Sequence, residues 1–182
     1  ITITGINDVP VAIDVSCSGT EGGTIATTLT ATDVDDSNSA GFNFSIVSQP
    51  TDITGSVSIG DVNYSSGTFT AVATYTHDGS ETTSDSFTYK ANDGTDDSNT
   101  STATITITAV NDAPITANVS GSGSEGGTVS TTLTATDVDN SDPGSFTFSI
   151  VNQPTSITGS VSIATPTYSS GTFTAVATYT HD

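Results

Sequence analysis

The chain has 182 residues, with 20 acidic side chains against one basic side chain, Lys90, and a formal net charge of −19. This balance excludes a nucleic-acid-binding role, because there are no cationic side chains to neutralise phosphates. The sequence has no membrane span, since no apolar run approaches the roughly 20 residues that a transmembrane helix needs. Cys17 is the single cysteine, so no disulfide can form within the chain.

The residue types favour β-structure almost everywhere. Thr, Val and Ile number 38, 15 and 14, whereas there are only two leucines. Such β-branched side chains fit a pleated sheet and are stiff in a helix. The composition therefore predicts an all-β fold with a neutral outer face rich in Ser and Thr.

Alternation of apolar and polar residues predicts seven strands between residues 11 and 108. In the second strand, Ile25, Leu29 and Ala31 share one face, which we expect to be buried. Clusters of Gly, Asp, Asn, Ser and Pro separate the strands, as turns require. The expected strands are Val11–Val15, Thr24–Ala31, Phe42–Val47, Ser56–Ile59, Gly67–Tyr75, Ser86–Ala91 and Thr100–Thr108.

The sequence repeats itself in a gapless register of 104 residues, in which 55 of 78 overlapping positions are identical. A unit of about 100 residues with seven strands indicates tandem seven-stranded Greek-key β-sandwiches. Residues 1–8 are expected to be the last strand and linker of a preceding repeat, since Ile1–Thr4 aligns with Ile105–Thr108. Residues 9–110 then form a complete repeat, and 111–182 a second repeat that lacks its last two strands.

Acidic residues gather where the predicted strands end. Asp33 and Asp35 continue the inward face of the second strand past its end, so both carboxylates are expected at the rim of the sandwich. Glu21 in a Gly-rich turn, together with Asp78 and Glu81 after the fifth strand, is expected at the opposite end. The acids present in both copies are Asp8 and Asp112, Glu21 and Glu125, Asp33 and Asp137, Asp35 and Asp139, and Asp78 and Asp182.

Stacking of one unit on the next predicts a shared cation site. Carboxylates packed together without a cation repel one another strongly at reduced dielectric. Ca²⁺ is the expected ligand, because it takes six to eight oxygens in flexible geometry, whereas Mg²⁺ demands an octahedron and keeps its waters. The alternative is that these acids are only solvated loop residues. For Asp96 and Asp97 we expect a solvated hairpin tip, with a peripheral ion site as the alternative. The residues expected to converge are Glu21, Asp78, Glu81, Asn111, Asp112, Asp137 and Asp139.

The segments 21–23, 31–38, 78–81, 85–94 and 110–114 resemble the cadherin-like repeats of large bacterial surface proteins and RTX-type adhesins. The resemblance covers essentially the whole chain and implies an immunoglobulin- or cadherin-like fold with Ca²⁺ at each junction. Two features depart from the cadherin pattern, namely Ala113 in place of a second linker Asn and the spacing of Asp78 and Glu81. One to three ions per junction are therefore all compatible with the sequence. The resemblance also implies a second ligand set at the other end of the first unit, made of Asn7, Asp8, Asp33, Asp35 and Asp93.

These features predict a non-enzymatic, extracellular role at the cell surface. The leading hypothesis is a calcium-rigidified spacer that projects an adhesive tip, whose host or substratum ligands bind through other domains and whose direct partners are neighbouring repeats. The alternatives are a filament or surface-layer subunit assembled by strand complementation, and a module that binds a glycan or protein directly. No nucleophile elbow, P-loop or Cys/His metal spacing occurs, and His77 and His181 are expected to be structural residues at strand ends.

Overall fold

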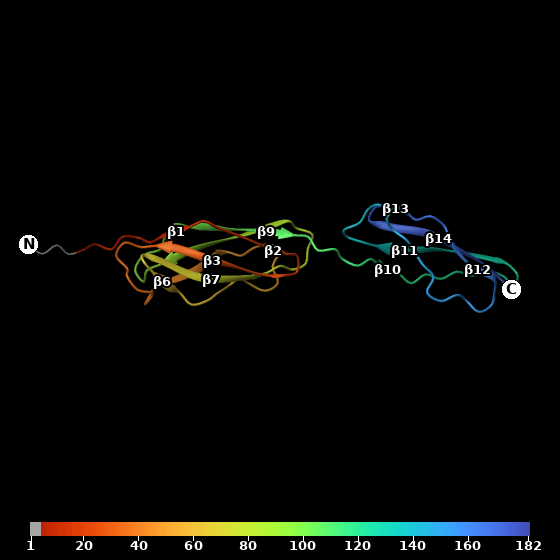
Figure 1. Ribbon diagram of the computed structural model, residues 1–182, viewed down its shortest axis with the longest axis horizontal. Helices are drawn as coiled ribbons and strands as arrows, with labels where there is room; N and C mark the ends of the chain where they lie inside the picture. The colour runs from red at the N-terminus through yellow and green to blue at the C-terminus, as the bar shows by residue number, and fades with distance from the viewer. Residues whose placement is uncertain (1–4) are drawn as a thin grey trace, which may run out of the picture. The chain divides into compact units, whose positions relative to one another are not determined.

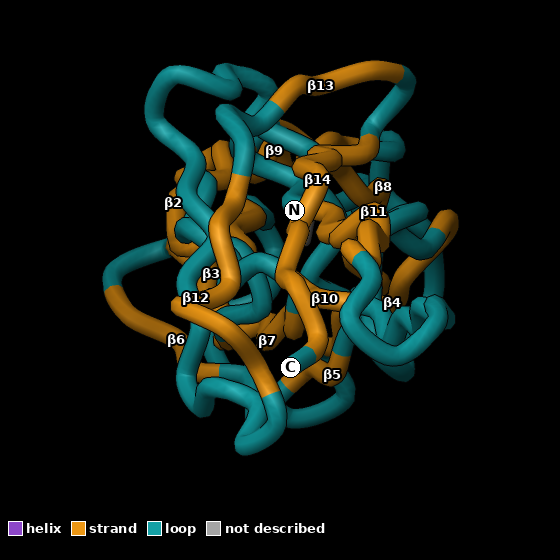
Figure 2. Tube along the Cα trace, turned by 90° about the vertical axis from the view of Figure 1, so that its right-hand side faces the viewer, coloured by secondary structure: helices purple, strands orange, loops and turns teal. Residues whose placement is uncertain are grey.

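The computed structural model describes residues 5–182, and Figure 1 labels its strands. The chain divides into two compact units, Ile1–Val110 (unit 1) and Asn111–Asp182 (unit 2). All regular elements of the described residues are strands, and no helix appears in Figure 2. The expected all-β fold is thus confirmed, while the expected strand Ile1–Thr4 lies outside the described residues. No helix that could cross a membrane is found in the part of the chain that the structure describes.

Unit 1 is a sandwich of two sheets. One sheet has the order β1-β3-β7-β5, with β6 also paired to β7, and the other has the order β2-β9-β8-β4. This division of strands is that of an immunoglobulin-like sandwich. The strands are β1 (Val11–Ile13), β2 (Val15–Thr20), β3 (Thr24–Thr32), β4 (Asn43–Ser48), β5 (Ser58–Ile59), β6 (Asn63–Ser65), β7 (Thr68–Thr76), β8 (Ser84–Asn92) and β9 (Ser101–Thr108).

The expected first strand, Val11–Val15, is in fact divided between the two sheets. β1 pairs antiparallel with β3, and after Asp14 the chain continues as β2, which pairs parallel with β9. The Asp14 carboxylate accepts a hydrogen bond from the Thr102 N–H (2.8 Å) at this crossing. The prediction missed β2 because its pairing partner is about 88 residues further along the chain. The short strand β6 was also missed.

The core lies between the two sheets and follows the expected alternation. Leu29 and Phe69 from one sheet are buried with Tyr89 and Ile105 from the other. Phe69 also stacks on Phe42, with ring centroids 3.7 Å apart and an interplanar angle of 5°. Burial of these apolar side chains is the main force that holds the sheets together.

Strand register decides which loops lie together. In the β3–β7 pair, Thr24 faces Thr76 and Thr32 faces Thr68. The loops before β3 and after β7 therefore share one end of unit 1, and the loop after β3 lies at the other. The second end also holds the β8–β9 turn, because Asn43, at the start of β4, pairs with Asn92, at the end of β8.

Unit 2 has a sheet of order β10-β11-β14-β12, with β13 paired to β14. Its small core includes Phe173, which stacks on Phe146 with centroids 4.0 Å apart. A second sheet is not found among its residues, all of which the structure describes. The strands are β10 (Ile115–Thr116), β11 (Thr128–Thr136), β12 (Ile157–Ile163), β13 (Thr167–Ser169) and β14 (Thr172–His181).

Candidate metal centre

The loop that follows β3 folds around the side chain of Asp33. Asp33 Oδ1 accepts hydrogen bonds from the backbone N–H groups of Asp35 (2.8 Å) and Asp36 (3.0 Å). An Asp side chain commonly organises a turn in this way, by bonding to backbone groups two and three residues on. Asp33 is only 8% exposed, so one of its oxygens is used by the turn and the other is held inside the loop.

The amino-terminal segment of unit 1 joins the same end. The Asp8 N–H donates to Asp35 Oδ2 (2.6 Å). The Asn7 side-chain amide donates to Asp93 Oδ2 (3.0 Å) and to Asp96 Oδ2 (3.2 Å). The residues that the resemblance grouped at this end, Asn7, Asp8, Asp33, Asp35 and Asp93, thus meet within unit 1, and we name them with Asp36 and Asp96 the entry cluster.

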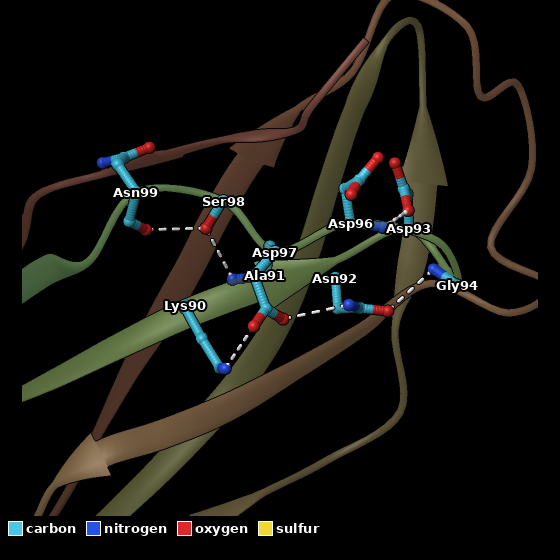
Figure 3. A network of polar contacts seen from close by, with 9 residues as sticks. All are labelled: Lys90, Ala91, Asn92, Asp93, Gly94, Asp96, Asp97, Ser98 and Asn99. Atoms are coloured by element: carbon cyan, nitrogen blue, oxygen red, sulfur yellow. Dashed lines mark hydrogen bonds and ion pairs between the residues drawn. The ribbon is translucent and has the colours of Figure 1, made fainter. Parts of the chain in front are cut away.

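Asp93 plays the same part in the β8–β9 turn that Asp33 plays after β3. Its Oδ1 accepts the N–H groups of Thr95 (2.6 Å) and Asp96 (2.7 Å). These bonds to Asp96, Asn7 and Thr95 stabilise the charged carboxylate and hold the pKa of Asp93 below its usual range. Gly94, with φ of +99°, allows the tight turn. The carboxylates of Asp93 and Asp96 lie on the same side of the turn (Figure 3).

Lys90 neutralises a different carboxylate of this hairpin. Its Nζ lies 2.5 Å from Asp97 Oδ2, and Asn92 Nδ2 donates to Asp97 Oδ1 (2.9 Å). The bonds from Lys90 and Asn92 lower the pKa of Asp97. In Figure 3 this pair lies on the opposite side of the hairpin from the carboxylates of Asp93 and Asp96. The only basic side chain other than histidine is therefore unavailable to the entry cluster.

Two buried oxygens of the entry cluster have no hydrogen-bond partner, Asp33 Oδ2 and Asp36 Oδ2. Burial, followed by the charges of Asp33, Asp93 and Asp35, raises the pKa of Asp36. Buried charge without a partner is costly unless a counter-ion is bound. Carboxylate oxygens without sulfur or imidazole ligands suit a hard divalent cation such as Ca²⁺, so the unpartnered oxygens of Asp33 and Asp36 fit the metal that the sequence predicts.

The other end of unit 1 carries Glu21 and Glu81, with carboxylate oxygens within 4.8 Å of each other. Glu21 Oε2 accepts the Val110 N–H (3.0 Å), just after β9. The Ser80 N–H and hydroxyl bond to Asp78 and lower the pKa of its carboxyl group. The three acids predicted for this end, Glu21, Asp78 and Glu81, are therefore all in its loops.

Buried His77 organises the loops at this end. Its Nδ1 accepts the N–H groups of Gly22 (3.2 Å) and Gly79 (3.1 Å), and its Nε2 lies 3.0 Å from Thr82 Oγ1. Because Nδ1 accepts two hydrogen bonds, the ring carries its proton on Nε2. His77 thus has the structural role that the sequence indicated.

The first residues of unit 2 and the loop after β11 repeat part of the hydrogen-bonding pattern of the entry cluster. The Asp112 N–H donates to Asp139 Oδ2 (2.5 Å), as Asp8 does to Asp35. Asp137 Oδ1 accepts the N–H groups of Asp139 (3.1 Å) and Asn140 (2.9 Å). The Asn111 amide donates to the Asp112 carbonyl oxygen (2.8 Å). The four predicted ligands that belong to unit 2, Asn111, Asp112, Asp137 and Asp139, therefore lie in adjoining loops of that unit.

Two members of the entry cluster, Asp36 and Asp96, are not among the predicted ligands of this end. Asp36 was overlooked although it is the third acid of the Asp-Val-Asp-Asp segment, and Asp96 was expected to be a solvated tip residue or part of a peripheral ion site. The three-residue spacing of Asp93 and Asp96 could have predicted that Asp96 belongs to the cluster. An Asp side chain often accepts a hydrogen bond from the backbone N–H group three residues further on, which places that residue in the same turn. The burial that isolates Asp36 Oδ2 had no signature in the sequence.

Comparison with known proteins places the chain in a family. Residues 7–108 match the family described as the bacterial Ig domain. Among curated protein sequences, none matches the chain.

Among solved structures, the chain is similar to an endo-fucoidan hydrolase from glycoside hydrolase family 107, at 15% identity and a TM-score of 0.44. The match covers 100% of this chain and 25% of the hydrolase chain. The chain is also similar to the Yersinia pseudotuberculosis adhesin InvE (18% identity, TM-score 0.32), over 93% of this chain and 50% of that chain. The surface layer protein SbsC, domains 4–9, matches at 10% identity and a TM-score of 0.32, over 97% and 27% of the two chains. Since the family match at residues 7–108 covers more than half of the 182 residues, the chain belongs to the bacterial Ig domain family.

Proposed function

We propose that the chain is a calcium-rigidified extracellular spacer of a large bacterial surface adhesin, built from cadherin-like repeats. Membership of the bacterial Ig domain family supports a repeat of this kind. The observation that carries the calcium assignment is the entry cluster, where two buried carboxylate oxygens have no partner and the single lysine is bound elsewhere.

Calcium has a simple mechanical role in this proposal. Asn7 and Asp8 belong to the segment that leads into the sandwich, whereas Asp33, Asp36 and Asp93 belong to its loops. A cation bound to both groups would fix the entering segment to the sandwich, and its loss would let the carboxylates of Asp8 and of the loops repel one another. We propose the same role for the hinge residues Asn111 and Asp112, with Asp137 and Asp139, at the start of unit 2.

The energy per ion is expected to be modest. Extracellular modules bind Ca²⁺ with dissociation constants near 10⁻⁴–10⁻³ M. A tenfold excess of calcium over the dissociation constant then adds about 1.4 kcal/mol of stability per site. Many junctions in series would nevertheless set the stiffness of a long surface protein.

Calorimetry and small-angle X-ray scattering of the whole chain test this function. Calcium at a few millimolar should raise the melting temperature of unit 1 and narrow the distribution of interatomic distances, and EGTA should reverse both effects. The variant Asp33→Asn should lose most of the calcium response. Asp61→Asn, at an exposed residue between β5 and β6, is the matched control and should respond like the unchanged protein. Identical melting and scattering in calcium and in EGTA would refute the proposal.

A further inference from the structure

Asp36 differs from Asp35 and Asp93 of the entry cluster in the hydrogen bonding of its carboxylate. Asp35 and Asp93 accept hydrogen bonds from the entering segment. Asp36 instead has an oxygen, Oδ2, that is both inaccessible to solvent and without a hydrogen-bond partner. Asp33 Oδ2 is in the same condition, and Asp33 as a whole is more than nine-tenths buried. Two unpartnered carboxylate oxygens from one loop therefore need a compensating group, which a bound cation would supply.

Unit 2 shows what the same loop looks like when that requirement is removed. The counterpart of Asp36 is Asn140, whose Nδ2 donates to Ser145 Oγ (3.1 Å). Asn140 Oδ1 accepts the Asp142 N–H (2.9 Å). Both ends of the amide are thus satisfied inside the loop. The counterpart of Ser145 in unit 1 is Gly41, which has no hydroxyl group to offer.

The surroundings of Asp36 make it a poor place for an uncompensated charge. Its charged neighbours are Asp33, Asp93 and Asp35, all of the same sign. Lys90, the one Lys or Arg in the sequence, is paired with Asp97. Since side-chain cations are excluded, a bound metal ion is the group that fits.

We infer that Asp36 is a direct ligand of a divalent cation, shared with Asp33, and that it makes this loop of unit 1 bind the cation more tightly than an Asn at the same position would. The inference rests on the proposed function, because it assigns an additional ligand to the calcium site of the entry cluster. Affinity for Ca²⁺ depends on the number of charged ligands. Removing the charge of Asp36 while keeping its shape should therefore weaken binding about tenfold.

The test is a calcium titration of the whole chain and of the variant Asp36→Asn, which places in unit 1 the residue that unit 2 already has. Isothermal calorimetry should show the affinity of one site reduced about tenfold, while the control Asp61→Asn stays within about twofold. In EGTA, Asp36→Asn should melt no lower than the unchanged protein, since it removes a repulsive charge. An Asp36→Asn variant with unchanged calcium affinity would overturn the inference.

A second measurement does not depend on any variant folding. In the unchanged protein, the side-chain carboxyl carbon resonances of Asp33 and Asp36 should both shift as calcium is added, whereas that of Asp61 should not. If Asp33 shifts and Asp36 does not, the proposed calcium site stands and the role of Asp36 is wrong. If no carboxyl resonance of the entry cluster shifts at millimolar calcium, the inference and the proposed function fail together.

Discussion

Most aligned positions of unit 1 and unit 2 are identical, yet only unit 1 forms two sheets. The sheet built from β3 and β7 has a close counterpart in β11 and β14, with equivalent register from end to end. By contrast, residues 119–124 and 147–152, which correspond to β2 and β4, are not strands in unit 2. Segments that are similar in sequence therefore adopt different local structures in the two copies.

The difference shows that β2 and β4 depend on partners far away in the sequence. β2 pairs with β9, and β4 pairs with β8. Unit 2 has no counterpart of the β8–β9 hairpin among its strands, and residues 119–124 and 147–152 pair with no strand of that unit. Buried backbone groups need such partners, and alternation of side chains does not replace them.

The largest expected effect comes from supplying that hairpin. A chain extended after Asp182 by a second copy of residues 79–108 should turn residues 119–124 and 147–152 into strands and bury the second face of the β11–β14 sheet. Hydrogen exchange should then show these amides protected as strongly as those of β2 and β4. Extension by a copy with Phe87→Asp and Ile105→Asp, two residues of the unit 1 core, is the control. Protection equal in both extended chains would contradict the dependence on β8 and β9.

A second contrast between the units is the environment of His77 and His181. Both backbone N–H groups donate to a glycine carbonyl oxygen at 3.0 Å, from His77 to Gly23 and from His181 to Gly127. The His77 ring is buried and accepts two backbone N–H groups, whereas His181 Nδ1 contacts the neighbouring Asp182 carbonyl and its side chain is 41% exposed. The loops before β3 and after β7 therefore enclose the ring of His77.

Substitution of these histidines should sharpen that contrast. His77→Ala leaves the Gly22 and Gly79 N–H groups unsatisfied and should lower the free energy of unfolding of unit 1 by about 1–3 kcal/mol. His181→Ala should change the stability of unit 2 by less than about 0.5 kcal/mol, as a surface substitution does. Urea denaturation, monitored by hydrogen exchange of the amides of β3 and β11, measures the stability of the two units separately. Equal losses for the two variants would show that the ring contacts contribute nothing to stability.

The sequence was sufficient to predict the features that depend on the local pattern of apolar and polar residues. It was insufficient for the features that depend on contacts between segments far apart in the sequence. Period-2 alternation correctly placed Leu29 and Ala31 in the core, and the ends of the predicted strands correctly separated Glu21 from Asp33. The passage of the chain from β1 to β2 at Asp14 was not predicted, because it is fixed by the pairing of β2 with β9. Asp36 was not singled out for a similar reason, since its oxygen becomes isolated only in the folded loop, with Asp93 of the distant β8–β9 turn nearby.

The smallest expected effect concerns a feature that the two units share. Ser66 and Ser170 have φ of 50° and 49°, and each is followed by a glycine with positive φ, Gly67 or Gly171. Two successive residues with positive φ between paired strands form a type I′ turn, for which Asn-Gly is the preferred sequence. A serine at the first position is therefore mildly strained in both copies.

Ser66→Asn and Ser170→Asn should each stabilise their unit by about 0.5 kcal/mol, because Asn tolerates the left-handed conformation better than Ser does. Val at either position should destabilise the unit, since β-branched residues are poorly suited to positive φ. Urea denaturation of the four variants measures both effects. The turn is closed by the adjacent pairs Ser65–Thr68 and Ser169–Thr172, which need no contribution from β8 or β9. Equal gains in the two units would therefore show that this turn is encoded locally, whereas a gain confined to unit 1 would mean that even the β6–β7 turn depends on the second sheet.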